Sequence, residues 1–129
     1  MLKITLVALG NKMPIWVEQA VSEFTKRLRD TVSFSIAEIP LKKRGKSQEF
    51  SRILEKETAQ VLQVIPTGSY LIALDAKGTE FNSVELAKKL EKLQQQNSHL
   101  CFLIGGPEGL SQKLLNESQE KWSLSKLTL

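Results

Sequence analysis

Residues 102–111 read FLIGGPEGLS, and here an apolar run ends abruptly at two glycines, a proline, a glutamate and a third glycine. The run begins at His99 and continues to Ile104, which is typical of a strand covered on both faces. A second run of this kind, YLIAL, spans residues 70–74 and ends at Asp75. Strands buried on both faces occur mainly in parallel sheets that carry helices on either side.

Helical patterns alternate with these strand patterns along the rest of the chain. Apolar residues recur at helical spacing after Pro14, Ser47 is a candidate N-cap, and Asn82 with Glu85 resembles a capping box. The alternation predicts an α/β fold with a mainly parallel sheet flanked by helices. The expected strands are 2–9, 34–39, 70–74 and 99–104; the expected helices are 14–29, 47–64, 82–95 and a short one from 111; residues 122–129 are a strand or a loop.

The composition limits the kind of protein this can be. Its 129 residues fit one domain, and 41% hydrophobic with 25% charged residues is ordinary for a soluble globular protein. Cys101 is the only cysteine, and its apolar neighbours favour a small buried thiol over a nucleophile. His99 is the only histidine, so we expect no metal site. The sequence has neither a signal-peptide pattern nor a membrane-spanning apolar stretch, and we expect a cytoplasmic protein.

The charge balance favours a polyanionic partner. The formal net charge is +4 and the pI is about 9.3. Four basic residues gather around a glycine in the segment 41–47, which makes them candidates for contact with RNA phosphates; a solvated basic loop is the alternative. These residues are Lys42, Lys43, Arg44 and Lys46.

The glycine-rich segment follows a strand, and ligands of open α/β sheets bind beyond the carboxyl ends of the strands. The motif is neither the dinucleotide-binding fingerprint nor a P-loop, so it does not indicate a phosphate cradle. Two interpretations remain. One is a tight strand-to-helix turn without a ligand. The other is a ligand held by backbone groups and apolar walls, such as an adenine with a small polar tail.

Five ordered blocks resemble one known family. They are LVALGNKMPIWV at 6–17, EIPLKKRGKS at 38–47, LIALDAKG at 71–78, FLIGGPEGLS at 102–111 and WSLSKLTL at 122–129. The chain is thereby similar to the RlmH family, SPOUT-class methyltransferases that modify N3 of a pseudouridine in large-subunit (23S) ribosomal RNA. The resemblance implies S-adenosylmethionine as methyl donor, a C-terminal trefoil knot, a homodimer, the assembled ribosome as substrate, and no metal.

The same resemblance implies which residues meet the cofactor. Gly105 and its neighbour approach the donor through their backbone, and the C-terminal block forms the loop around adenine. Glu108 and Asp75 are candidates for the base that accepts the imide proton, although the sequence assigns the catalytic role to neither. The implied cofactor-binding residues are Leu74, Gly105, Gly106, Ser125, Lys126, Leu127, Thr128 and Leu129.

Members of that family continue past the position of Leu129 with a proline, a basic and aromatic stretch and a final helix. We therefore expect residues 1–129 to form a single SPOUT domain that lacks this tail. Three functions remain open at this point. The first is an S-adenosylmethionine-dependent rRNA methyltransferase. The second is a ribosome- or RNA-binding domain without catalysis, and the third is a small-molecule enzyme with a generic α/β pocket.

Overall fold

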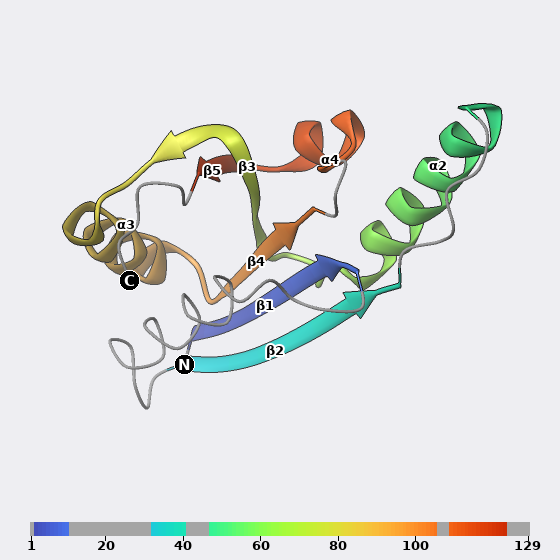
Figure 1. Ribbon diagram of the computed structural model, residues 1–129. Helices are drawn as coiled ribbons and strands as arrows, with labels where there is room; N and C mark the ends of the chain where they lie inside the picture. Colours follow the sequence, from blue (N-terminus) through green and yellow to red (C-terminus); the bar gives the residue numbers. More distant parts are fainter. Residues whose placement is uncertain (1, 11–31, 41–46, 106–108, 124–129) are drawn as a thin grey trace.

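The computed structural model describes residues 2–10, 32–40, 47–105 and 109–123. Within these ranges five parallel strands form one sheet in the order β2-β1-β4-β3-β5 (Figure 1). Helices connect the later strands, as a parallel sheet requires. The expected α/β class is therefore confirmed. The strands are β1 (Leu2–Leu9), β2 (Val32–Ile39), β3 (Tyr70–Glu80), β4 (His99–Ile104) and β5 (Glu120–Ser123); the helices are α2 (Ser47–Val64), α3 (Ser83–Gln96) and α4 (Gln112–Glu117).

The strand register brings the carboxyl ends of all five strands to one end of the sheet. A single row of paired residues crosses the whole sheet close to that end, and Gly105 directly follows the β4 member of the row. We call this end of the sheet the carboxyl end. From β2 to β5 the row consists of Glu38, Ala8, Ile104, Leu74 and Trp122.

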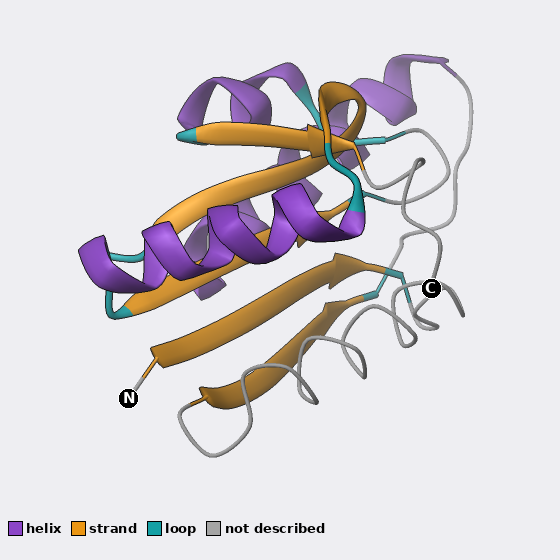
Figure 2. Cartoon of the chain, turned by 90° about the vertical axis from the view of Figure 1, so that its left-hand side faces the viewer, coloured by secondary structure: helices purple, strands orange, loops and turns teal. Residues whose placement is uncertain are grey.

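Each face of the sheet has its own apolar core, and helices lie on both sides of the strands (Figure 2). On one face, Leu86, Leu90 and Leu93 of α3 pack against alternate strand residues. On the other face, Val61 of α2 and Leu114 of α4 pack against the intervening residues. Because both faces are covered, the central strand β4 is apolar almost throughout, as its sequence predicted.

Strand β3 is longer than its apolar run predicted. The run ends at Asp75, but β3 continues to Glu80 and bends strongly on the way (Figure 1). Pairing with β5 is interrupted, because Leu74 and Thr79 are both register partners of Trp122. Residues 75–78, which we call the β3 bulge, lie between these two pairings. The extension depends on β5, whose place beside β3 no local pattern reveals.

Other element boundaries agree closely with expectation. Strand β2 begins two residues earlier than expected, and α3 has the predicted capping box: Glu85 N donates to Asn82 Oδ1 at 2.8 Å and Asn82 N donates to Glu85 Oε1 at 2.9 Å. The expected helix at 14–29, the basic segment at 41–46 and the C-terminal residues 124–129 lie outside the described residues. In the part of the chain that is described, no helix has the length and apolarity needed to cross a membrane.

Candidate functional site

The carboxyl end of the sheet brings together two of the residues implied as cofactor contacts. Leu74 of β3 is paired with Ile104 of β4, and Gly105 follows Ile104 at once. Ile104 is buried, whereas Leu74 and Gly105 are both partly accessible. An apolar side chain and a bare backbone segment therefore lie side by side where ligands of parallel sheets bind.

The chain itself explains why residue 105 is a glycine. A Cβ atom placed there would lie 2.7 Å from the carbonyl carbon of Gly109 and 2.9 Å from the amide nitrogen of Leu110. Gly109 has a φ of +78°, a left-handed conformation that favours glycine, and a Cβ there would meet no atom within 4 Å. The turn after β4 thus needs one glycine for close packing and another for its backbone angle, before any ligand is considered.

The end of this turn is anchored to helix α2. Ser111 caps α4, since its Oγ accepts a hydrogen bond from Leu114 N at 3.3 Å, and it also accepts one from Thr58 Oγ1 at 2.9 Å. Thr58 and the adjacent Glu57 are buried on the inner side of α2. This contact ties the position of the glycine-rich turn to the helix that follows β2.

The β3 bulge lies against the backbone of β5. A Cβ atom at Gly78 would lie 2.6 Å from both the carbonyl carbon of Lys121 and the amide nitrogen of Trp122. Gly78 has no positive φ, so contact rather than backbone angle excludes a side chain. Asp75, a candidate base, opens the bulge and is half-buried directly after Leu74. The bulge therefore holds a carboxylate at the carboxyl end of the sheet.

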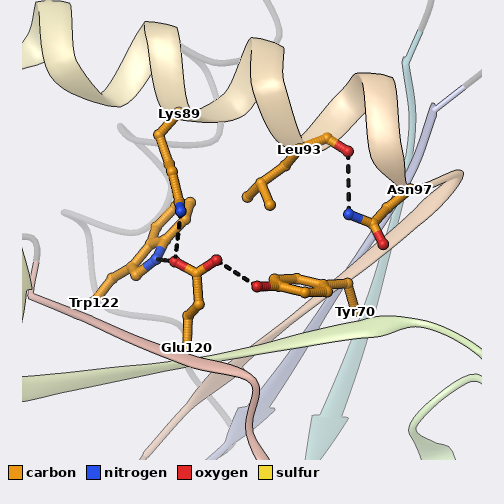
Figure 3. A network of polar contacts seen from close by, with 6 residues as sticks. All are labelled: Tyr70, Lys89, Leu93, Asn97, Glu120 and Trp122. Carbon is orange, nitrogen blue, oxygen red and sulfur yellow. Dashed lines mark hydrogen bonds and ion pairs between the residues drawn. The ribbon is translucent and has the colours of Figure 1, made fainter.

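A polar network joins strands β3 and β5 to helix α3 (Figure 3). Glu120 of β5 accepts hydrogen bonds from Tyr70 Oη at 2.5 Å and from Trp122 Nε1 at 3.0 Å, and it forms a 3.1 Å ion pair with Lys89 of α3. Burial by itself raises the pKa of Glu120, but the three donors and the charge of Lys89 outweigh it, so the pKa is lowered. Burial and the contact with Glu120 raise the pKa of Tyr70 to about 12.

The amino ends of the strands carry different chemistry. Thr5 Oγ1 lies 2.7 Å from His99 Nε2 and 3.1 Å from Ser35 Oγ, which links three adjacent strands. Burial, and next the charge of Lys3, lower the pKa of His99. Burial also raises the pKa of Cys101 to about 12, so the thiol stays protonated at neutral pH. The sequence-based choice of a buried thiol over a nucleophile agrees with this.

Several predicted site residues fall outside the described residues. These are one glycine and the glutamate of the turn after β4, the C-terminal adenine-loop residues, and the four basic candidates for RNA contact. Their roles stay predictions. By number they are Gly106, Glu108, Ser125, Lys126, Leu127, Thr128, Leu129, Lys42, Lys43, Arg44 and Lys46.

The described part of the carboxyl end suits a neutral or cationic nucleoside better than a phosphate. It offers the apolar side chain of Leu74, the backbone of Gly105 and the half-buried carboxylate of Asp75. Carboxylates accept hydrogen bonds from hydroxyl and ammonium groups, which S-adenosylmethionine carries. Among the described residues no group of three or more histidines, cysteines or acidic residues is placed to hold a metal ion.

Sequence reasoning missed Gly78, Glu120 and Glu57. Gly78 ends the block LIALDAKG at 71–78, but the contact that excludes a side chain at this position comes from β5. Glu120 has an ordinary sequence context, and only the fold brings it to Tyr70 and Lys89. Glu57 did leave a signal, because it precedes the buried Val61 by one helical turn and so shares its face.

Comparison with known proteins agrees with the family resemblance of the sequence blocks. A family model described as predicted SPOUT methyltransferase matches residues 2–129. A protein of Legionella pneumophila (strain Paris) named Ribosomal RNA large subunit methyltransferase H is 56% identical over 129 residues, which is 100% of this chain and 83% of that protein. Proteins with the same name are 42% identical over 129 residues in Xylella fastidiosa (strain 9a5c), covering 100% and 82%, and 40% identical over 126 residues in Dichelobacter nodosus (strain VCS1703A), covering 98% and 81%.

Proposed function

Because this chain belongs to the SPOUT methyltransferase family, we propose that it methylates N3 of a pseudouridine in the large-subunit (23S) rRNA of the assembled ribosome, with S-adenosylmethionine as donor. The observation that carries this proposal is the family match over residues 2–129. Relatives named as large-subunit rRNA methyltransferases, 40–56% identical to nearly the whole chain, support the RNA substrate. The proposal includes a homodimeric protein, one SPOUT domain over residues 1–129 with a C-terminal knot, and a cytoplasmic location.

In this proposal the donor binds at the carboxyl end of the sheet. Leu74 lines the adenosine, while Gly105 and Gly106 approach it through their backbone. The C-terminal residues Ser125, Lys126, Leu127, Thr128 and Leu129 complete the site. Supporting evidence is the pairing that makes Leu74 and Gly105 neighbours, together with their partial accessibility.

The protein's contribution to the reaction is mainly positioning. S-adenosylmethionine supplies an activated methyl group, and transfer needs N3 of the pseudouridine in line with it. N3 carries an imide proton that must leave, and a nearby carboxylate can accept it. Among the described residues, Asp75 is the candidate for this role, because it is half-buried beside Leu74. Glu108, which follows β4 in the sequence, is the second candidate.

Basic residues of the segment 41–46 are proposed to contact rRNA phosphates. Neutralising Lys43 and Arg44 together should weaken ribosome binding and reduce its salt dependence, by a slope of roughly 0.7–0.9 for each phosphate that is no longer neutralised. The measurement is the ribosome dissociation constant across a salt series. Neutralising Lys88 and Lys92, exposed on α3, provides a charge-matched control. An equal change in both double variants would reject the specific contact.

The decisive experiment is methyl transfer from labelled S-adenosylmethionine to ribosomes that lack the modification. We expect label in the large-subunit rRNA, at N3 of one pseudouridine, and much less label on protein-free rRNA. Ribosome binding without transfer would instead favour the non-catalytic binding domain. Absence of both ribosome binding and transfer would favour a small-molecule enzyme and overturn the proposal.

A further inference from the structure

Glu120 occupies an unusual place in the fold. Its carboxylate receives donors from three elements: Tyr70 at the start of β3, Lys89 on α3 and Trp122 on β5 itself (Figure 3). Its side chain is 21% exposed, so solvent replaces these donors poorly. A carboxylate that accepts several hydrogen bonds at once holds their donors in fixed positions.

Trp122 is the part of this network that reaches the carboxyl end of the sheet. Its side chain is fully buried, at 0% exposure. Phe81 and Phe102 meet it edge-on, with ring centroids at 5.1 Å and 5.4 Å. The aromatic contacts fix the plane of the indole, while the hydrogen bond to Glu120 fixes its direction.

The backbone of Trp122 pairs with β3 on both sides of the β3 bulge. Leu74 and Thr79, on either side of the bulge, both pair with it, and Gly78 lies against its amide nitrogen. A displacement of Trp122 therefore moves Leu74 and the start of the bulge at Asp75. The network lies below the carboxyl end of the sheet, but through Trp122 it fixes the positions of Leu74 and Asp75 at that end.

We infer that Glu120 is a positioning residue for cofactor binding: by holding Trp122 it fixes the β3 bulge beside Leu74. This inference rests on the proposed function, since it concerns the same site. Among the described residues, the polar partners of Glu120 are Tyr70, Lys89 and Trp122 rather than Leu74 or Gly105, so we infer that it acts through Trp122. Its removal should therefore weaken cofactor binding more than its effect on stability explains.

The test compares three variants of the full chain by calorimetric titration with S-adenosylmethionine. Glu120→Gln keeps the size of the side chain but leaves one carbonyl oxygen for three donors. Lys89→Met removes one donor and leaves the bonds from Tyr70 and Trp122. Asn82→Ala is the control, because it removes the cap of α3 at an exposed site without touching Glu120.

We expect Glu120→Gln to bind S-adenosylmethionine about tenfold more weakly, and Lys89→Met to bind it with a smaller loss. Asn82→Ala should bind like the unchanged protein, even where urea unfolding shows that it is destabilised as much as Glu120→Gln. Equal affinity in Glu120→Gln and the unchanged protein would overturn the inference. Equal weakening in Glu120→Gln and Asn82→Ala would reduce Glu120 to a structural role and also overturn it.

Tryptophan fluorescence gives a second readout that stability alone does not move. In a Trp16→Phe background Trp122 is the remaining tryptophan, because the chain contains two. Its emission should respond to S-adenosylmethionine, and the response should shrink in Glu120→Gln. An undiminished response in that variant would contradict the positioning role. If the unchanged protein binds no S-adenosylmethionine, the proposed function fails, and the inference falls with it.

Discussion

Two glycines at the carboxyl end of the sheet, Gly105 and Gly78, are each crowded by backbone atoms, but the crowding has different origins. Gly105, after β4, is crowded by Gly109 and Leu110 of its own turn. Gly78, in the β3 bulge, is crowded by Lys121 and the next residue of β5, far along the chain. One contact is local and the other joins two strands.

The two contacts differ in how easily the crowding backbone atoms can move. Gly109 and Leu110 belong to no long strand or helix, so they can shift around a new side chain at residue 105 with less loss of strand pairing, although the adjacent Ser111 is anchored to α2. The β5 backbone beside Gly78 is held by strand pairing and by the buried Trp122. Equal crowding should therefore cost more stability in the bulge than in the turn, because packed interiors yield little.

The largest effect is expected for Gly78→Ala. The new Cβ would fall 2.6 Å from β5 backbone atoms, and we expect a loss of about 2–3 kcal/mol in the free energy of unfolding. Urea unfolding measures it. Ala76→Ser, at an exposed position of the same bulge, should change stability by less than about 0.5 kcal/mol. Similar values for the two variants would show that the bulge does not press on β5.

Gly105→Ala should lower stability less than Gly78→Ala does, but it should weaken cofactor binding. We expect a smaller loss of stability, about 1–2 kcal/mol, because the turn can move away from the Cβ. The same movement should disturb the proposed cofactor site and greatly weaken S-adenosylmethionine binding. Titration and urea unfolding of one sample measure both. Unchanged affinity in a folded Gly105→Ala protein would remove this residue from the proposed site.

Gly109→Ala isolates backbone strain from crowding within the same turn. No atom lies within 4 Å of its would-be Cβ, but φ is +78°. The expected cost is about 1 kcal/mol, from the left-handed conformation alone. Gly109→Asn should cost less, because asparagine tolerates this region better. A lower free energy of unfolding for Gly109→Asn than for Gly109→Ala, measured in urea, would contradict the strain explanation.

The smallest effect concerns the amino ends of the strands. The pKa of His99 is lowered from 6.5 in the folded protein, so the unfolded state binds more protons between the lowered pKa and 6.5. Stability should therefore rise with pH across that window, and fall as the solution is acidified through it. His99→Gln should flatten this dependence in unfolding measured from pH 5 to pH 8. An unchanged pH profile in the variant would exclude His99 as its source.

Much of the fold could be predicted because its signals are local. The strands at 2–9 and 99–104, the helix at 47–64 and the capping box of α3 have the predicted bounds or contacts. Apolar runs and caps depend on neighbours within a few residues. The later half of β3 was missed because it exists only where β5 pairs with it.

The candidate site divides in the same way. The resemblance to a known family pointed to Leu74 and Gly105, which lie where two apolar strand patterns end, and the register places them close together by pairing Leu74 with Ile104. Gly78 and Glu120 were missed, because their partners come from strands and helices distant in sequence.

The alternation of strands and helices and the buried character of β4 could be inferred from the amino-acid order alone, because they follow from the periodicity of apolar residues. The glycine-rich turn after β4 was also recognisable there, but the contact that excludes a side chain at Gly105 was not. The strand order, the interruption of β3 opposite Trp122 and the carboxylate that holds that tryptophan emerge only in the folded protein. Strand order and long-range contacts depend on which distant segments pack together, and that choice is made by the free energy of the whole core.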